Sequence, residues 1–572
     1  MLAIAVDAVP ALPNIPNGIF NVTNYGALGD GATANTAAIQ SAIDAASASG
    51  GGTVEIPMAP SAYLCGPFKL ANNINLQIND GAILRMLPFG QYPATYFTNV
   101  NGSTTDITWR AAAFISGTSL HDIEISGSGA IDGQGLPWWP YAKTRGDARP
   151  VMIRLTGCNR TLIQNVTLSN SPMFHISIGG RNGNTTVRGV TILAPASTAN
   201  PPSHNTDACD VSGTNILVQN CNISVGDDDF TCGGGTSDVV LTNNTYGNGH
   251  GVSIGSYTSP SVSNITVINC TFNGTDNGIR IKSDNDRGGL VQNISYCNIG
   301  MTNVHFPIQI YSYYNEVGTP GSISPDHAST QAVAAVTGKT PIFRNITFSN
   351  INATSVSGYP VGIIWARTEM PATNIVFNRV NVTGDRSFCL YNVSAAQFVD
   401  SKVTGASNRD TFAIFNTQLV ITNSDPTAML VTFDGVAANG CGNSLALYNS
   451  QAELKSPGAL GASPSLTLAA STLAIGGNLN LAPASVVNFV LGSKTAEITT
   501  ASNLFLNGIV NVSAGIGFTA TDYVLFTYPG NLGGVATLGT VPAGYNCAFN
   551  TNTSGQVKLI AILPPGNLHT IP

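Results

Sequence analysis

Five polar clusters stand out in the middle of this 572-residue chain, whose remaining sequence is dominated by Asn, Thr, Ser, Gly and apolar residues. They combine carboxyl groups and an imidazole, which can give and take protons, with two cations and three phenols. In chain order they are Asn205-Thr-Asp207, Gly226-Asp227-Asp228-Asp229, Gly249-His250-Gly251, Arg280-Ile-Lys282 and Tyr311-Ser-Tyr313-Tyr314. Each cluster alone is common in structural positions, but their joint occurrence in this order indicates an active site.

The spacing of these clusters matches a repeat in the surrounding sequence. Asp207 and Asp228 are 21 residues apart, and His250 and Arg280 follow after another 22 and 30. A short alternating β motif recurs with gaps of 23 to 29 residues and one gap of 52, interpreted as two periods with an obscured copy between them; its leading apolar residues are Leu162, Val187, Ile216, Val239, Ile265, Ile294, Ile346 and Ile375. This period is typical of a β-solenoid. The sequence therefore predicts an all-β fold, a right-handed parallel β-helix.

Stacked coils would bring the polar clusters to one face. Neighbouring strands lie about 4.8 Å apart, so residues about one period apart are expected to form a column on the outer surface. Arg280 and Lys282 should point outward together, because a strand alternates every two residues. Asp227 and Asp228 can act together only if the backbone bends between them, and Gly226 is the candidate for that bend.

The remaining elements frame this solenoid. Residues 35–48 have the pattern of an amphipathic helix, with Asn35 as the candidate N-cap and Gly50-Gly-Gly as the stop, and this helix is expected to cap the open end of the first coil. From about residue 425 charged residues become scarce, while the alternation persists. We therefore assign residues 1–424 to a β-helical catalytic domain and residues 425–572 to a β-rich accessory or spacer domain.

The composition argues against several classes of function. The net charge of -7 disfavours general nucleic-acid binding, which needs a basic surface. No stretch approaches the roughly 18 apolar residues of a membrane span. The ten cysteines form no CxxC pair, which gives no support to a zinc or dithiol site, and their disulfide state is left open. We predict no cofactor and no metal, and we expect a monomer.

The motifs NTD, DD, GHG and RIK, together with Phe20-Asn-Val-Thr-Asn-Tyr-Gly and Ile131-Asp-Gly-Gln-Gly, resemble the signature of the polygalacturonases, family 28 of the glycoside hydrolases. The resemblance extends over about 400 residues. It implies a parallel β-helix, in agreement with the period, and inverting hydrolysis of α-1,4 galacturonosyl linkages in an anionic pectic polysaccharide. It also implies a secreted protein, although this chain begins without a signal-peptide pattern, so we expect the signal peptide to have been removed.

The resemblance also implies catalytic roles. Asp227 would be the general acid that protonates the leaving oxygen, because the leaving alkoxide is a poor leaving group. Asp207 and Asp228 would hold and deprotonate the attacking water. His250 would order this carboxylate network or contact the sugar.

Four further residues are implied in substrate binding. Arg280 and Lys282 resemble the pair that binds the galacturonate carboxylate, for which a guanidinium offers two-point recognition. Asn205 of the NTD motif is the third. Tyr314 would pack on the sugar, in competition with the other two tyrosines of its cluster.

One departure and three alternatives remain open at this stage. Asp229 stands where the family commonly has Cys, and it is either structural or an additional subsite charge. The alternatives are hydrolysis of xylose-bearing or rhamnose-containing pectin, a pectate or pectin lyase with a basic catalytic residue and commonly calcium, and a non-catalytic β-helical adhesin. The intact acids speak against the adhesin, and GHG favours hydrolysis over elimination. Endo or exo cleavage depends on loops at the ends of the cleft, such as residues 85–115 and 315–340.

Overall fold

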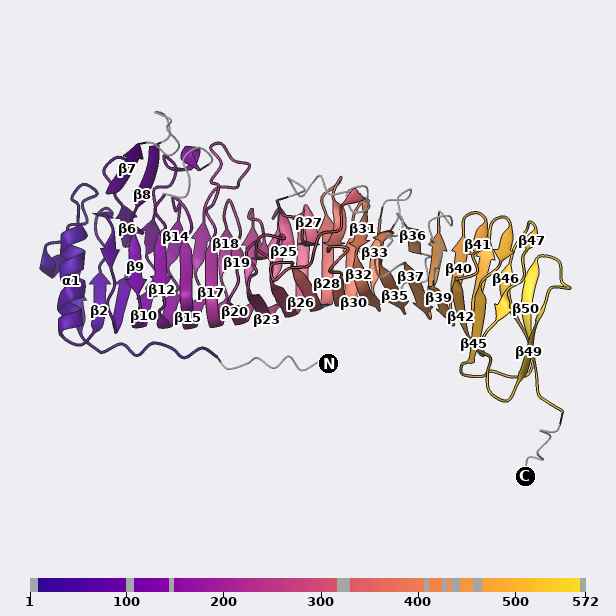
Figure 1. Ribbon diagram of the computed structural model, residues 1–572. Helices are drawn as coiled ribbons and strands as arrows, with labels where there is room; N and C mark the ends of the chain where they lie inside the picture. The colour runs from indigo at the N-terminus through magenta and orange to yellow at the C-terminus, as the bar shows by residue number, and fades with distance from the viewer. Residues whose placement is uncertain are drawn as a thin grey trace, which may run out of the picture. The chain divides into compact units, whose positions relative to one another are not determined.

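The computed structural model describes residues 9–98, 107–142, 149–315, 330–405, 411–423, 429–433, 443–455 and 465–565. It divides into two compact units. The first comprises residues up to Ser283 and Arg287–Gln309, and the second comprises Asp284–Asp286 and the residues from Ile310 onward. Both consist of short strands stacked in parallel coils (Figure 1). The predicted all-β, parallel β-helical fold is confirmed.

The first unit has three ladders of parallel strands. One contains β1 (Ile19–Asn21), β2 (Gly52–Ile56), β5 (Ile74–Ile78), β10 (His121–Ser126), β13 (Asn159–Gln164), β15 (Ile176–Arg188), β17 (Cys209–Gln219), β20 (Thr236–Thr242), β23 (Ser261–Ile268) and β26 (Leu290–Val304). The second contains β3 (Tyr63–Cys65), β6 (Ile83–Met86), β11 (Ala130–Asp132), β14 (Thr167–Ser169), β16 (Thr191–Leu193), β18 (Asn222–Ser224), β21 (Thr245–Gly247) and β24 (Thr271–Asn273). The third, here termed the site sheet, contains the first parts of β15 and β17 together with β4 (Phe68–Lys69), β9 (Ile115–Thr118), β12 (Ile153–Thr156), β19 (Phe230–Cys232), β22 (Val252–Ile254) and β25 (Asn277–Lys282).

The predicted capping helix is present as α1 (Thr36–Ala48), which contacts β1, β2 and β4 at the N-terminal end of the coils (Figure 1). Its Ile39 and Ile43 are buried, as the pattern indicated. Asn35 occupies the predicted N-cap position, and its carbonyl oxygen accepts the Ile39 N–H. Its side chain does not cap the helix, because it accepts the Leu28 N–H at 2.7 Å and donates to the Leu64 carbonyl instead. Two 3-10 turns, η1 (Val22–Tyr25) and η2 (Trp139–Tyr141), and an antiparallel hairpin of β7 (Ala94–Thr98) and β8 (Ile107–Ala111) complete this unit.

The predicted column of apolar residues is correct from Ile216 onward but not at its first two positions. Ile216 pairs with Thr185, which pairs with Thr161, so Leu162 and Val187 lie beside the column. The register is set by the residue before the column, which has a positive φ at both Asn184 and Asn215 and throughout the ladder. Buried threonines therefore occupy the positions of the column for which we predicted apolar residues. The obscured copy expected in the 52-residue gap would fall near residue 320, outside the described residues.

The second unit has two long parallel ladders. One contains β28 (Ile342–Ser355), β30 (Ala372–Thr383), β32 (Val393–Val399), β35 (Gln418–Thr422), β37 (Ser444–Tyr448), β39 (Ser465–Ala469), β42 (Val486–Leu491), β45 (Ile509–Ala514) and β48 (Thr537–Leu538). The other contains β29 (Pro360–Trp365), β31 (Arg386–Tyr391), β34 (Phe412–Phe415), β36 (Met429–Phe433), β38 (Gln451–Leu454), β40 (Thr472–Ile475), β43 (Glu497–Thr500) and β46 (Asp522–Thr527). Smaller elements are β27 (Phe306–Tyr311), at the division of the units, β33 (Lys402–Thr404), the antiparallel strands β49 (Asn546–Asn550) and β50 (Gln556–Ile562), and a separate sheet of β41 (Leu479–Leu481), β44 (Leu504–Leu506) and β47 (Leu532–Gly533).

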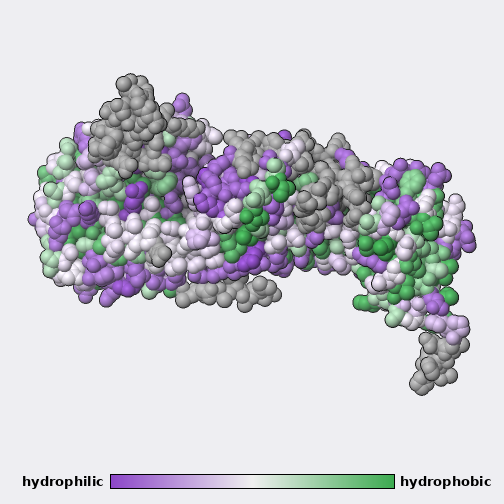
Figure 2. Space-filling view, in the orientation of Figure 1, coloured by the Kyte–Doolittle hydropathy of each residue, from purple (hydrophilic) through white to green (hydrophobic). Residues whose placement is uncertain are grey.

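The change of composition near residue 425 is not accompanied by a change of fold. Residues 424–428 lie outside the described residues, but β35 before them pairs with β37 after them in parallel, from Gln418 opposite Ser444 to Thr422 opposite Tyr448. The compact units divide near Ile310 instead. A separate role for residues 425–572 stays a prediction. Apolar side chains are exposed over the last strands of this unit, among them Ile516 and Val535 (Figure 2).

None of the helices in the described part of the chain is long and apolar enough to span a membrane. The nine cysteines in this part are all free thiols, six of them buried.

Candidate active site

The sequence-predicted residues meet at four neighbouring coils of the site sheet. The acids and the histidine lie in the turns that lead into the strands, and the cations lie within a strand: Asp207 precedes β17, Asp227 and Asp228 precede β19, His250 precedes β22, and Arg280 and Lys282 lie in β25. The predicted column is offset rather than absent, because Asp207, Asp228 and His250 each lie three residues before the strand residue of their own coil that is in register with Arg280. The residues in register across the sheet are Asp210, Thr231, Ser253 and Arg280.

The turn position explains how two adjacent acids reach the same site. Asp227 and Asp228 lie outside a regular strand, so the two-residue alternation does not apply to them. Gly226 is required there for close packing, because a Cβ at this position would lie 2.1 Å from the Ser203 hydroxyl oxygen.

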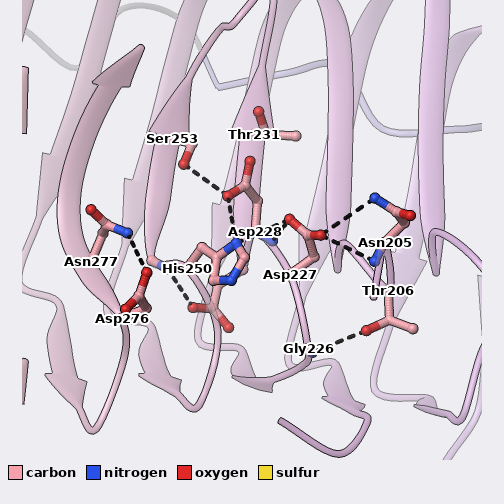
Figure 3. A network of polar contacts seen from close by, with 12 residues as sticks. Asn205, Thr206, Gly226, Asp227, Asp228, Thr231, His250, Ser253, Asp276 and Asn277 are labelled. Carbon is pink, nitrogen blue, oxygen red and sulfur yellow. Dashed lines mark hydrogen bonds and ion pairs between the residues drawn. The ribbon is translucent and has the colours of Figure 1, made fainter. Parts of the chain in front are cut away.

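Asp227 is the most exposed of the three catalytic acids, with 18% of its side chain accessible. Its Oδ2 accepts a hydrogen bond from the backbone N–H of Asn205 at 3.0 Å, and its Oδ1 lies 3.1 Å from His250 Nδ1 (Figure 3). Burial acts to raise the pKa of Asp227, but His250 and the more distant Lys282 and Arg280 outweigh it and hold the pKa below its usual range. These charges therefore favour the ionised form of Asp227.

Asp228 is held by three donors and is only 2% exposed. The Arg280 guanidinium and the Ser253 hydroxyl both donate to its Oδ1, and Lys282 Nζ donates to its Oδ2 at 2.9 Å. Burial acts to raise the pKa of Asp228, but the two cations outweigh it and lower the pKa. The cations that we assigned to the substrate thus pair with this carboxylate, and both are themselves buried.

Asp207 has the opposite electrostatic environment. It is 7% exposed, and its Oδ1 is buried without a hydrogen-bond partner. Burial, and then the charges of Asp227 and Asp228, raise the pKa of Asp207 well above its usual range. These surroundings therefore favour a proton on Asp207, whereas Asp227 and Asp228 are ionised.

Asp229 lies beneath the GHG turn. It is completely buried, and its Oδ2 accepts the Gly251 N–H at 2.9 Å. A Cβ at Gly249 would lie 2.3 Å from the Asp229 carboxyl group, so glycine is the residue that leaves room for it. Burial raises the pKa of Asp229 well above its usual range, with smaller contributions from Asp228 and Asp227. These contacts favour the structural alternative for Asp229 over a subsite charge.

Arg149 is a part of the site that sequence reasoning missed. It is 3% exposed, and its guanidinium donates to the carbonyl oxygens of Pro172 and His204 and to Asn205 Oδ1 at 2.8 Å. It holds Asn205 at a φ of 58°, from which the Asn205 N–H reaches Asp227. The only available signal was a single arginine before Pro150 in a chain with few charges.

Tyr314 belongs to the second unit, where its ring centroid lies 6.2 Å from that of Tyr311. Tyr311 and Tyr313 are 2% and 1% exposed, whereas Tyr314 is partly exposed. Of the three competing tyrosines, Tyr314 therefore has the ring that remains accessible, and its contact with substrate stays a prediction.

Asp227, Asp228 and His250 have ligand atoms within 4.8 Å of one another, the one such group found among the described residues. Their surroundings disfavour a metal, because Arg280 and Lys282 already neutralise Asp228 and would repel a divalent cation. The arrangement is suited to proton transfer between carboxyl groups and an adjacent imidazole.

Two family models and several known proteins match this chain. The family model described as Glycosyl hydrolases family 28 matches residues 94–403, and one described as Rhamnogalacturonase A/epimerase, pectate lyase-like, matches residues 19–58. The chain is 32% identical over 368 residues to a probable polygalacturonase of Arabidopsis thaliana, covering 63% of this chain and 73% of that protein. It is 33% identical over 337 residues to an endo-polygalacturonase of Pectobacterium carotovorum subsp. carotovorum, covering 53% of this chain and 80% of that protein. The solved structure of a Yersinia enterocolitica family 28 exopolygalacturonase has a TM-score of 0.55 at 20% identity, over 72% of this chain and 79% of that one.

Proposed function

Since the chain belongs to glycosyl hydrolases family 28, an inverting, polygalacturonase-like family, we propose that it hydrolyses the α-1,4 galacturonosyl linkages of polygalacturonan. The observation that carries this proposal is the joint occurrence of three carboxyl groups, one imidazole and two buried cations at four adjacent coils. We further propose that the protein acts as a secreted monomer on pectin outside the cell, which gel filtration of the culture medium would test.

Asp227 is proposed as the general acid because it is the carboxyl group most open to a bound sugar. The surrounding protein charges lower its pKa, so it has to gain a proton as substrate binds. An anionic sugar near His250 and the cations would offset their charges and exclude water, and both effects raise the pKa of a carboxyl group. The Asp227 proton would then pass to the glycosidic oxygen as its bond to the anomeric carbon breaks.

Asp228 and Asp207 are proposed to act on the attacking water. Asp228 is kept ionised by Arg280 and Lys282, as a base requires. Asp207 lies beside it with an unpartnered oxygen that can orient the water. As the water oxygen bonds to the anomeric carbon from the opposite face, its proton would pass to this pair, which inverts the configuration.

A lyase mechanism is less consistent with these contacts. Its base would have to be an arginine or lysine free to take a proton from the sugar, whereas Arg280 and Lys282 both donate hydrogen bonds to the Asp228 carboxylate. Calcium would have to displace these cations. The observation therefore favours hydrolysis.

The test is a reducing-end assay on polygalacturonate with a chelator present. Hydrolysis predicts new reducing ends without ultraviolet-absorbing products, and loss of this activity in Asp227→Asn. Unsaturated products would move the protein to the lyases, and activity on xylogalacturonan alone would move it to substituted pectin. The size distribution of early products decides between endo and exo action.

A further inference from the structure

The outward column of the site sheet continues well beyond the catalytic residues, toward the N-terminal coils. Asp210 is in register with Ser177, Ser177 with Arg154, Arg154 with Ser116, and Ser116 with Lys69. Each of these residues faces outward between inward-facing neighbours, as Arg154 does between the buried Ile153 and Leu155. The strands β9, β12, β15 and β17 follow one another along the first unit (Figure 1), and β4 pairs with β9.

Arg154 and Lys69 differ from the other cationic side chains of the first unit in having no described polar partner. Arg154 and Lys69 are exposed, and neither side chain makes a hydrogen bond or ion pair with any described residue. The other described cationic side chains of the first unit are engaged: Arg85 with Asp132, Arg149 with Asn205, Arg160 with Asp122, Arg188 with Gln164, Arg280 and Lys282 with Asp228, and Arg287 with Ser256. Arg154 and Lys69 thus keep their charge available to a ligand.

The spacing of these cations suits an extended uronic-acid chain. Strands lie about 4.8 Å apart, so Arg154 stands about 24 Å from Arg280, five strands away, and about 10 Å from Lys69, two strands away. A 1,4-linked hexuronan that lies along the column advances by about one sugar per strand. Its carboxylates would meet Lys69 and Arg154 about two sugars apart, with Ser116 facing the sugar between them and Ser177 the next sugar toward the catalytic residues.

Resting on the proposed function, we infer that Arg154, with Lys69 beyond it, forms a distal subsite that binds galacturonate carboxylates several sugars away from the cleaved bond. A guanidinium binds a carboxylate through two parallel hydrogen bonds, so Arg154 is the stronger member. Asp210, between this subsite and the catalytic residues, has its pKa raised by burial to about 6. At lower pH its carboxyl group is mostly neutral and does not repel the substrate.

Length-resolved kinetics test the subsite. Arg154→Gln and Lys69→Gln are compared with Arg188→Gln, which removes the same charge from another ladder of the same unit. For Arg154→Gln we expect kcat/KM on heptagalacturonate to fall about three- to tenfold, mainly through KM, the range of a partly exposed charge-assisted contact. The loss on trigalacturonate should be at least threefold smaller, and Arg188→Gln should behave as wild type on both. Melting curves confirm that the variants are folded.

Equal losses on short and long oligomers, or no loss on either, would overturn the subsite. Calorimetric binding of heptagalacturonate to wild type and Arg154→Gln gives a second readout that needs no turnover. A wild-type protein that binds the heptamer through Arg154 but releases no reducing ends would refute the proposed function and leave the subsite standing. If wild type hydrolyses polygalacturonate but Arg154→Gln binds heptagalacturonate as tightly as wild type, the subsite is refuted and the proposed function stands.

Discussion

Lys282→Gln separates two roles that the structure and the family resemblance give to this lysine. The Lys282 ammonium lies 2.9 Å from Asp228 Oδ2, and both side chains are buried. A hydrogen bond to a buried charged group contributes about 1.5 to 3 kcal/mol. At about 1.4 kcal/mol per pKa unit, its loss should raise the pKa of Asp228 by about one to two units, because the cation favours the ionised carboxylate.

The assay is the pH dependence of kcat/KM on polygalacturonate, which reports the titration of the free enzyme. Asp228 has to be ionised to take the proton of water, so the acid limb of the profile should move upward by about one to two pH units. Because the carboxyl groups interact, the limb belongs to the cluster as a whole. Lys282→Arg, which keeps the charge, should restore most of the wild-type position.

The reasoning is refuted if Lys282→Gln raises KM while the acid limb stays in place. That result would mean that Lys282 binds only the substrate carboxylate, as the sequence motif suggested, and has no influence on Asp228. A variant that fails to fold is recognised by its melting curve, and in that case Ser253→Ala, which removes a neutral donor from the same carboxylate, should give a smaller shift in the same direction.

Three further predictions follow from the site and the fold. Asp229→Asn should keep most activity and should stabilise the protein increasingly as pH rises from 5 to 8. The pKa of Asp229 is raised in the folded protein, so its stabilising contribution is present below about pH 4 and is lost at higher pH. Melting curves at pH 5 and pH 8 check this. Asp207→Asn and Asp227→Asn should each remove nearly all turnover while melting curves show that the variants remain folded, and an active Asp227→Asn would exclude it as the acid. Truncation after residue 424 should leave the site residues in place but lower solubility, because β35 would lose β37 and become an exposed edge; a truncated protein as soluble as the full chain would contradict this.

Much of the site was predictable because a solenoid converts spacing in sequence into proximity in space. Asp228 and Arg280 are 52 residues apart, yet two coils bring their side chains into an ion pair. The order of the motifs was enough to place these residues together. It was not enough to say which partner each charge has, because the pairing depends on the turns before the strands rather than on the period.

Other parts were beyond prediction from pattern alone. Thr161 and Thr185 occupy the inner column because the residue before each of them has a positive φ, and this turn sets the register of the strand. The pattern of apolar residues alone does not reveal the position of that turn. Arg149 acts through the backbone of a turn 55 residues later, which no periodicity encodes. The composition of residues 425–572 predicted a separate domain, which stays a prediction, but composition does not mark a change of fold there, because β35 and β37 continue one parallel ladder.

The reactivity of the free thiols among the described residues can report the unfolding of individual coils. Six buried cysteines are spread over several coils between Cys65 and Cys270, and burial raises the pKa of Cys65 to about 12 and of Cys221 to about 11. Alkylating reagents attack thiolates, so these positions react only when the surrounding coil opens. Since a repeat protein opens coil by coil, mass spectrometry of alkylated peptides at increasing denaturant would give the order in which the coils lose their structure.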